Sequence, residues 1–208
     1  MEKINQGVEN WERSNVRVFW GEVAPCEHVV QLYESDKEVL DTLEAFIIDG
    51  LQRDECVLIM ATQGHLSELE LRLIARGLKL PDLLEDNQYI PLNAEECLNK
   101  FIVSGWPNEK LFFSFIESVM TRTGNRKVRA FGEMVAVLWA QGKSGATVQL
   151  ENLWHKLHTL NKFCLYCAYP KIGFTQNFND SIHQICKCHS KVIRTNEFPA
   201  TEIYFKSA

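Results

Sequence analysis

Strand-like and helix-like patterns of apolar residues alternate along this chain. The first strand pattern is His28–Tyr33, and the four residues Ser35–Glu38 that follow it form a capping box, in which the serine and glutamate side chains can bond each other's backbone amides. Apolar residues then recur at three- and four-residue spacing as far as Leu51, which predicts an amphipathic helix. Cys56–Ala61 is apolar without interruption, as is typical of a strand buried on both faces.

The same alternation continues towards the end of the chain. The further strands are predicted at 89–92, 128–133 and 163–169, with an edge strand at 203–205, and the further helices at 66–76, 93–105, 106–124, 150–157 and 180–193. This alternation of strands and helices implies an α/β fold, in which a mostly parallel sheet of five or more strands has helices on both faces.

One domain accounts for the whole of this pattern. We divide the chain into an N-terminal arm, residues 1–24, and a single domain, residues 25–208, because no linker or repeat interrupts the alternation. The formal charge of −5 and the pI near 5.7 argue against a general nucleic-acid partner, which needs a basic face. The polar N-terminus and the lack of a run of ~20 apolar residues predict a cytoplasmic protein with no membrane partner.

Candidate ligand-binding residues follow from the predicted sheet. In parallel α/β sheets ligands bind beyond the carboxyl ends of the strands, so polar side chains at those positions define the candidate site. We select Tyr33, Glu34, Asp36, Thr62, His65, Glu133 and Tyr169. Such a set suits a small polar or mixed ligand, with aromatic walls and a few hydrogen-bonding groups, better than an anion.

Glu133 leaves two interpretations open. It ends a buried strand, where a carboxylate is costly unless it is paired or hydrogen-bonded. It is either a structural partner of Arg129 or of a helix N-terminus, or a ligand contact and conformational relay.

The loop after the first strand does not suit phosphate. A P-loop needs glycines whose amides surround the phosphates and a lysine that reaches them. Here Tyr33–Lys37 contains no glycine and includes two carboxylates. The triplet Gly142–Ser144 resembles the end of a P-loop, but Val137 replaces the required glycine and no strand precedes it. We therefore expect an ordinary turn there, and neither tight ATP binding nor hydrolysis.

Seven cysteines raise the question of a metal. Cys164 and Cys167 lie three apart in a predicted strand, so their side chains point to opposite faces. Cys186 and His189 share a predicted helix face with isoleucines, which indicates core packing. We expect no metal and no other cofactor, and the sequence leaves a redox or metal role of Cys164, Cys167, Cys186 and Cys188 open.

Four segments resemble a known family. HVVQLYESDKEVLDTLEAFIIDGL, VRAFGEMVAVLWAQG, LENLW and FCLYCAYP are similar to the MEDS domain, the sensory domain of methanogens, methylotrophs and the dichloromethane-responsive repressor, between Trp20 and Ile193. His155 departs from the pattern, which favours an amide side chain after LENLW. The resemblance implies a RecA/KaiC-like three-layer fold without a P-loop. It also implies a ligand-sensing role in signalling, since such domains are often joined to histidine kinases or DNA-binding domains.

We therefore expect a non-enzymatic sensory domain that binds an unknown small molecule and signals to a separate partner protein, such as a histidine kinase or transcription regulator. Two alternatives remain: an interaction-only module whose degenerate nucleotide site is closed, and a divergent nucleotide hydrolase. The sequence leaves the oligomeric state open, a homo-oligomer included.

Overall fold

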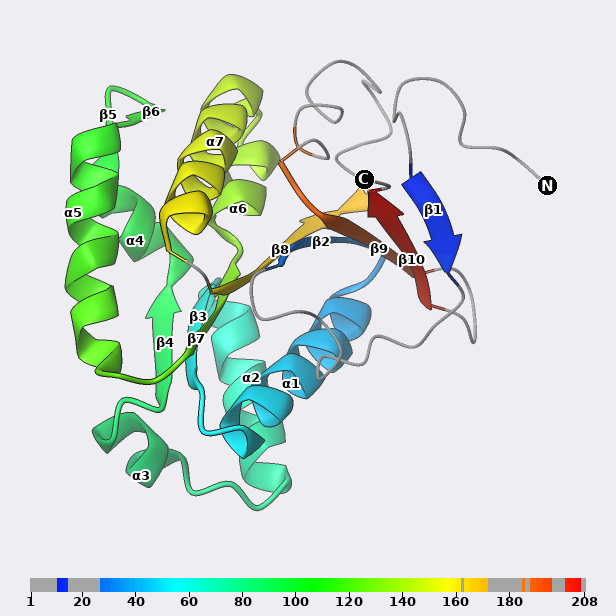
Figure 1. Cartoon of the computed structure of the whole chain (residues 1–208), viewed down its shortest axis with the longest axis vertical. Helices are drawn as coiled ribbons and strands as arrows, with labels where there is room; N and C mark the ends of the chain where they lie inside the picture. The colour runs from blue at the N-terminus through cyan, green and yellow to red at the C-terminus, as the bar shows by residue number, and fades with distance from the viewer. Residues whose placement is uncertain are drawn as a thin grey trace.

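The computed structural model describes residues 11–14, 27–161, 163–171, 185, 188–195 and 201–206. Eight strands form one twisted sheet in the order β1-β10-β9-β2-β8-β7-β3-β4 (Figure 1). The strands are β1 (Trp11–Ser14), β2 (His28–Tyr33), β3 (Cys56–Ala61), β4 (Tyr89–Asn93), β7 (Val128–Gly132), β8 (Cys164–Pro170), β9 (Lys191–Thr195) and β10 (Thr201–Lys206). The strands from β9 to β4 in this order are parallel, whereas β10 and β1 pair antiparallel at one edge.

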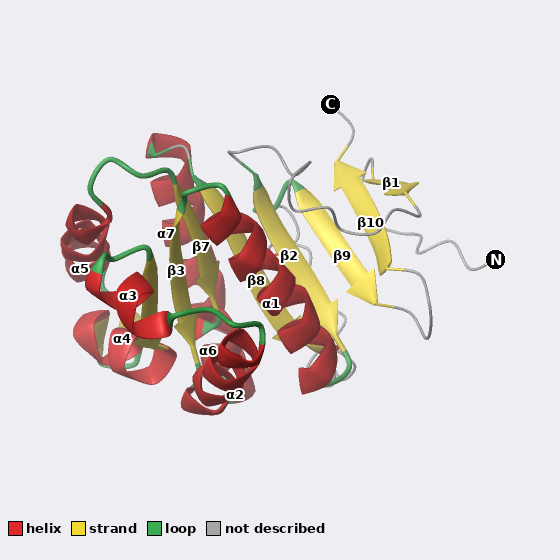
Figure 2. Cartoon of the chain, turned by 90° about the horizontal axis from the view of Figure 1, so that it is seen from below, coloured by secondary structure: helices red, strands yellow, loops and turns green. Residues whose placement is uncertain are grey.

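Helices cover both faces of this sheet (Figure 2). On one face lie α1 (Asp36–Gln52), α2 (Gln63–Ala75) and α3 (Leu80–Glu85), and on the other α4 (Ala94–Phe101), α5 (Glu109–Met120), α6 (Met134–Ala140) and α7 (Ser144–Leu160). The predicted three-layer α/β fold with a mostly parallel sheet is therefore confirmed. None of the described helices is long and apolar enough to cross a membrane.

Alternation along the strands divides the core into two halves. In β8, Cys164, Tyr166 and Ala168 pack under α1 and α2, whereas Leu165, Cys167 and Tyr169 pack under the α4–α7 layer. Successive strand residues point to opposite faces, so a residue's position in its strand decides which layer it contacts. The two cysteines of the CxxC segment accordingly face opposite layers, as predicted.

Several segments differ from the prediction. The expected helix over 180–193 is wrong at its end, because Lys191–Thr195 form β9, which pairs in parallel with β2. The predicted strand at 203–205 exists as β10 but is not the edge strand, since Trp11–Ser14 of the N-terminal arm add β1 outside it. The short helix α3 was not predicted.

A hairpin replaces the expected helix junction near residue 105. β5 (Ile102–Val103) and β6 (Trp106–Pro107) pair antiparallel, and the turn residues Ser104 and Gly105 both have positive φ. Gly105 accepts this left-handed conformation without a steric penalty, so the chain can reverse between β5 and β6. Helix α5 therefore begins at Glu109, where the Asn108 side chain accepts the amide of Leu111, rather than at the Trp-Pro pair.

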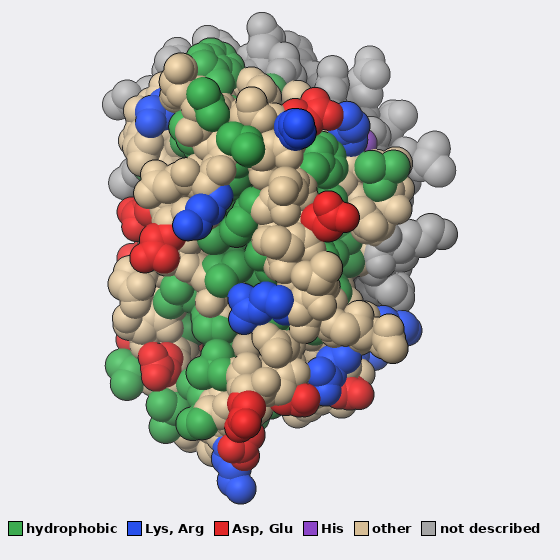
Figure 3. Space-filling view, turned by 90° about the vertical axis from the view of Figure 1, so that its left-hand side faces the viewer, with side chains coloured by type: hydrophobic (Ala, Val, Ile, Leu, Met, Phe, Trp, Pro, Cys, Tyr) green, Lys and Arg blue, Asp and Glu red, His purple; other side chains and the backbone are tan. Residues whose placement is uncertain are grey.

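The hairpin also holds α7 in place. Figure 3 shows a face of the molecule on which apolar side chains lie among charged ones. In and near the hairpin, Val103, Trp106 and Leu111 are about half exposed. The indole of Trp106 covers Gly145, where an added Cβ would lie 2.8 Å from the ring. Gln149 of α7 donates a hydrogen bond of 2.7 Å to the carbonyl of Pro107. These contacts fix the helix that supplies Glu151, a residue considered below.

Asn93 caps α4 and gives a test of local stability. Its Oδ1 accepts the amides of Glu95 and Glu96 at 2.9 and 3.1 Å, which satisfies two free donors at the start of α4. Asn93→Ala should lower the free energy of unfolding by about 1 kcal/mol in urea titrations. Asn93→Asp keeps an acceptor and should stay near wild type; equal losses in the two variants would contradict a capping role.

Candidate functional site

Four of the predicted ligand-site residues meet at the carboxyl edge of the sheet. Asp36 begins α1, Thr62 and His65 begin α2, and Glu133 directly follows β7. The Nε2 atom of His65 lies 3.6 Å from Oδ1 of Asp36, and its Nδ1 lies 2.9 Å from Oε1 of Glu133. The latter is an ion-pair distance, although the two groups are not aligned as in a hydrogen bond. The imidazole therefore lies between two carboxylates from different elements.

Glu133 is the buried centre of this group. Its side chain is only 6 % exposed, and its Oε2 accepts a 2.8 Å hydrogen bond from the backbone N–H of Thr62. Its own N–H donates to the carbonyl of Met60 at 2.8 Å. Glu133 thus joins the ends of β3 and β7 to the first turn of α2. Of the two structural partners considered for Glu133, it contacts the helix N-terminus, whereas Arg129 pairs with Asp49 and Glu55.

The electrostatics of the group are acidic. The Glu133 carboxylate raises the pKa of His65, an effect that outweighs the opposing effect of burial, and Asp36 adds to it. Tyr33 is buried beside them, and burial raises the pKa of its phenol, with further contributions from Glu133 and Asp36. A negative charge is therefore disfavoured at this edge of the sheet.

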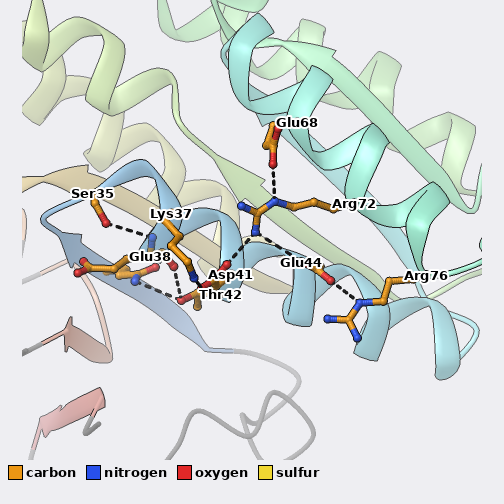
Figure 4. A network of polar contacts seen from close by, with 10 residues as sticks. Ser35, Lys37, Glu38, Asp41, Thr42, Glu44, Glu68, Arg72 and Arg76 are labelled. Atoms are coloured by element: carbon orange, nitrogen blue, oxygen red, sulfur yellow. Dashed lines mark hydrogen bonds and ion pairs between the residues drawn. The ribbon is translucent and has the colours of Figure 1, made fainter. Parts of the chain in front are cut away.

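A network of ion pairs fixes the two helices that meet at this edge (Figure 4). Arg72 of α2 contacts Asp41 of α1 at 2.8 Å and Glu68 of its own helix at 2.9 Å. One turn further on, Arg76 contacts Glu44 of α1 at 2.7 Å. Because these pairs join α1 to α2 along their length, a displacement at the first turn of α2 would be passed to α1.

The remaining two predicted site residues lie elsewhere. The Glu34 carboxylate is exposed and pairs with Lys171 rather than with the His65 group. Tyr169 lies on the opposite face of the sheet, fully buried, where its hydroxyl donates to Oε1 of Glu151. The rule that ligands bind at strand ends locates the correct edge, but it does not say which face each terminal side chain points to.

Two backbone amides at the turn between β2 and α1, where a P-loop protein binds phosphate, are bonded here by the protein's own side chains. The Ser35 hydroxyl accepts the amide of Glu38 at 3.4 Å, and Oε2 of Glu38 accepts the amide of Glu34 at 2.9 Å. The predicted capping box is present in part: Ser35 accepts the amide of Glu38 as expected, but Glu38 accepts the amide of Glu34 rather than that of Ser35. The triplet Gly142–Ser144 forms the turn between α6 and α7, with Gly142 at φ 72°, as expected for a helix-to-helix connection.

Among the described residues, a hollow of about 820 Å³ lies at the opposite, amino edge of the sheet. It is lined by Arg53–Glu55 and Arg122–Lys127, which flank the starts of β3 and β7. The lining contains both acids and bases, and one of the bases, Arg126, pairs with Asp54 and Asp86. It is distinct from the edge at which the candidate residues meet.

A second polar cluster was not predicted. His28, Glu151, Cys167 and His189 are all buried beneath α7, and one side-chain atom from each lies within 4.8 Å of the other three. Burial lowers the pKa of His28 and that of His189, the latter to about 4, and raises the pKa of Glu151 to about 8. One signal was visible in the sequence: Glu151 directly follows Leu150 in the predicted helix, next to its apolar stripe.

Fold and site together define a RecA/KaiC-like α/β domain in which a capped helix replaces the phosphate loop. A KaiC-like protein from the hyperthermophilic archaeon Pyrococcus horikoshii OT3 has a similar structure, with a TM-score of 0.59 and 11 % identity over 86 % of this chain and 77 % of that chain. Residues 27–190 match the family described as "MEDS: MEthanogen/methylotroph, DcmR Sensory domain". The chain belongs to the MEDS family. A search of the curated proteins found no match.

Proposed function

We propose that this MEDS domain is a non-enzymatic sensor that binds a small neutral or cationic molecule at the carboxyl edge of its sheet and signals to a separate partner protein. The observation that supports this most is the position of Glu133, which is buried yet joins two strand ends to the first turn of α2. A ligand that competes for this carboxylate would release the amide of Thr62 or the ring of His65. The movement of α2 that follows would reach α1 through the Arg72 and Arg76 ion pairs.

The same edge offers little to a nucleotide. The amides of Glu34 and Glu38 are already bonded by side chains, and Glu34, Asp36 and Glu133 add negative charge. A triphosphate site needs the opposite arrangement: backbone amides that are free to bind the phosphates, and a lysine that reaches them. We therefore propose that the protein neither binds Mg-ATP tightly nor hydrolyses it. The alternative is that no ligand competes for the Glu133 carboxylate, which then keeps its contacts with Thr62 and His65. In that case the domain is an interaction-only module.

Glu133→Gln tests the sensory role. Glutamine keeps the shape and an acceptor for the Thr62 amide, so we expect a wild-type fold at pH 8 but a lost ligand response. The measurement is the thermal shift produced by methanol, methylammonium and choline, with Mg-ATP and phosphate as anionic comparisons. Glu117→Gln, on the exposed face of α5, is the matched control and should respond as wild type does.

Three outcomes decide between the alternatives. Micromolar binding of Mg-ATP in isothermal titration calorimetry would contradict the nucleotide argument. A response that Glu133→Gln leaves unchanged would remove Glu133 from the site. A large loss of thermal stability in this variant, with no response to any probe in wild type, would favour the interaction-only module.

The raised pKa of His65 predicts a specific pH dependence. His65 binds its proton more tightly in the folded state than in the unfolded state. The pair of protonated His65 with Glu133 therefore stabilises the folded state fully below about pH 6.5. The stabilisation is lost as the pH rises through the pKa of the folded state. The melting temperature of wild type minus that of His65→Gln should therefore shrink between pH 6 and pH 9. Taking the difference between the two proteins removes the contribution of the other histidines to the pH dependence. A difference in melting temperature that stays constant with pH would show that the neighbouring carboxylates do not favour the protonated form of His65.

A further inference from the structure

We propose that His28, Glu151, Cys167 and His189 form a binding site for a divalent transition-metal ion, for which Zn²⁺ is the best fit. The four residues come from β2, α7, β8 and the segment before β9. They are between 0 and 2 % exposed, and they lie within a core that is otherwise largely apolar. The proposal is independent of any ligand at the Glu133 edge.

The distances among the four side chains suit a tetrahedral ion. Zn²⁺ binds imidazole and carboxylate at ~2.0–2.2 Å and thiolate at ~2.3 Å, which separates neighbouring ligand atoms by about 3.3–3.8 Å. The Sγ atom of Cys167 lies 3.5 Å from Nε2 of His28, and Nε2 of His189 lies 3.7 Å from Oε2 of Glu151. All four ligand atoms fall within 4.8 Å of one another. A shift of about 1 Å or less would complete the coordination.

Hydrogen bonds on the side away from the cluster orient three of the four side chains, as they do in known metal sites. Metal-binding histidines usually donate their second ring N–H to a carbonyl or carboxylate, which leaves the other nitrogen free for the ion. The Nδ1 atom of His28 lies 2.8 Å from the carbonyl of Cys188, and that of His189 lies 2.6 Å from the carbonyl of Ile185. A carbonyl only accepts, so both Nδ1 atoms donate and both Nε2 atoms offer a lone pair to the cluster.

The carboxylate is oriented in the same way. The hydroxyl of Tyr169 donates to Oε1 of Glu151, so the other oxygen faces the histidines. Within the described part of the chain, Oε2 of Glu151 and Nε2 of His189 are buried and have no hydrogen-bond partner. Buried polar atoms normally have a partner, and those that lack one call for an explanation such as an ion. A metal bonded to both atoms supplies it.

The charges also balance. A thiolate and a carboxylate together bring two negative charges, which a divalent ion neutralises, so the buried site as a whole carries no net charge. The donors, two imidazole nitrogens, one thiolate and one carboxylate oxygen, are those that zinc accepts; magnesium and calcium prefer oxygen alone. Because all four donors come from the protein, the site is closed and its role is to join the strands and α7 rather than to activate water.

This inference departs from the expectation that the protein binds no metal. That expectation considered the pair Cys164 and Cys167, whose side chains do diverge, and placed His189 in an apolar helix face. The proposed site uses one cysteine of the pair, Cys167, and combines it with residues from three other segments, of which His28 lies more than a hundred positions away in sequence.

Metal titration of the full chain tests the proposal. The reduced protein is stripped with a chelator and titrated with Co²⁺ and then with Zn²⁺. We expect one ion per chain, a thiolate-to-cobalt charge-transfer absorption, and a higher melting temperature with Zn²⁺. Cys167→Ser should abolish the absorption and weaken binding by at least about tenfold. Cys164→Ser is the matched control, since it is buried in the same strand but faces the opposite layer, and it should retain both.

A second variant covers the case in which Cys167→Ser does not fold. Tyr169→Phe keeps all four ligands and removes only the hydroxyl that orients Glu151, so binding should weaken by about 10–100-fold. The proposal is wrong if wild-type protein binds neither ion stoichiometrically, if bound Co²⁺ shows no thiolate absorption, or if Cys164→Ser loses as much affinity as Cys167→Ser.

Discussion

Replacement of Arg129 by methionine is expected to lower the free energy of unfolding by about 3 kcal/mol. Arg129 is 4 % exposed, and its guanidinium contacts Glu55 at 2.6 Å, Asp49 at 2.8 Å and the carbonyl of Phe46 at 2.9 Å. Methionine fills much of the volume but leaves two partly buried carboxylates without their cation. The loss lies at the lower end of the range for buried pairs because Glu55 and Asp49 keep some contact with water.

Urea titration followed by circular dichroism measures this loss. Arg126→Met is the control: Arg126 also contacts two carboxylates, Asp54 and Asp86, but at the surface, and its loss should cost much less. Arg129→Lys keeps the charge without the planar fork, so its loss should be intermediate. Equal effects at Arg126 and Arg129 would show that burial does not set the strength of these pairs.

Gly50→Ala is expected to destabilise the protein by about 1–3 kcal/mol, although alanine is normally the better helix residue by about 1 kcal/mol. An added Cβ at Gly50 in α1 would lie 2.8 Å from both Cδ of Arg129 and Cγ2 of Val57. Neither neighbour can move freely, because Val57 is fully buried in β3 and Arg129 is held by its ion pairs. The glycine therefore sets the distance between α1 and the sheet.

Gly64→Ala is the matched control for this substitution. Gly64 also lies in a helix, α2, but an added Cβ there would have no atom within 4 Å. Alanine should stabilise the protein there by about 0.4–1 kcal/mol. The melting temperatures of the two variants should move in opposite directions, and a stabilising Gly50→Ala would show that α1 can shift away from the sheet at little cost.

The elements that were predicted correctly are those in which local pattern and tertiary environment agree. The bounds of β2 and β3 match the prediction. β3 is a continuous apolar run, as a strand buried on both faces requires, and β2 departs from that pattern only at His28 and Gln31. β9 was missed because its sequence, Lys191–Thr195, is mixed in polarity and follows a helix-like pattern of isoleucines. Its place in the sheet is fixed by pairing with β2, far away in sequence.

The candidate site was predicted in part, for a similar reason. The strand-end rule brought together Asp36, His65 and Glu133, because each follows the end of a parallel strand. It gave no information on faces, so Tyr169 was grouped with residues from which the sheet separates it. The cluster of His28 and Glu151 could not be inferred from spacing, because only the order of the strands brings these residues together.

That order also has a consequence for synthesis of the chain. β3 can pair with both β4 and β7 as soon as residue 132 is available, whereas β2 is made before them and pairs with β8 and β9. Until those strands emerge from the ribosome, the apolar residues of β2 have no neighbours in the sheet. Pairings so distant in sequence form slowly. The half of the sheet that contains His28, Cys167 and His189 should therefore be the last to assemble, and a nascent chain halted before Lys191 should leave one edge of β2 open to pairing with other chains.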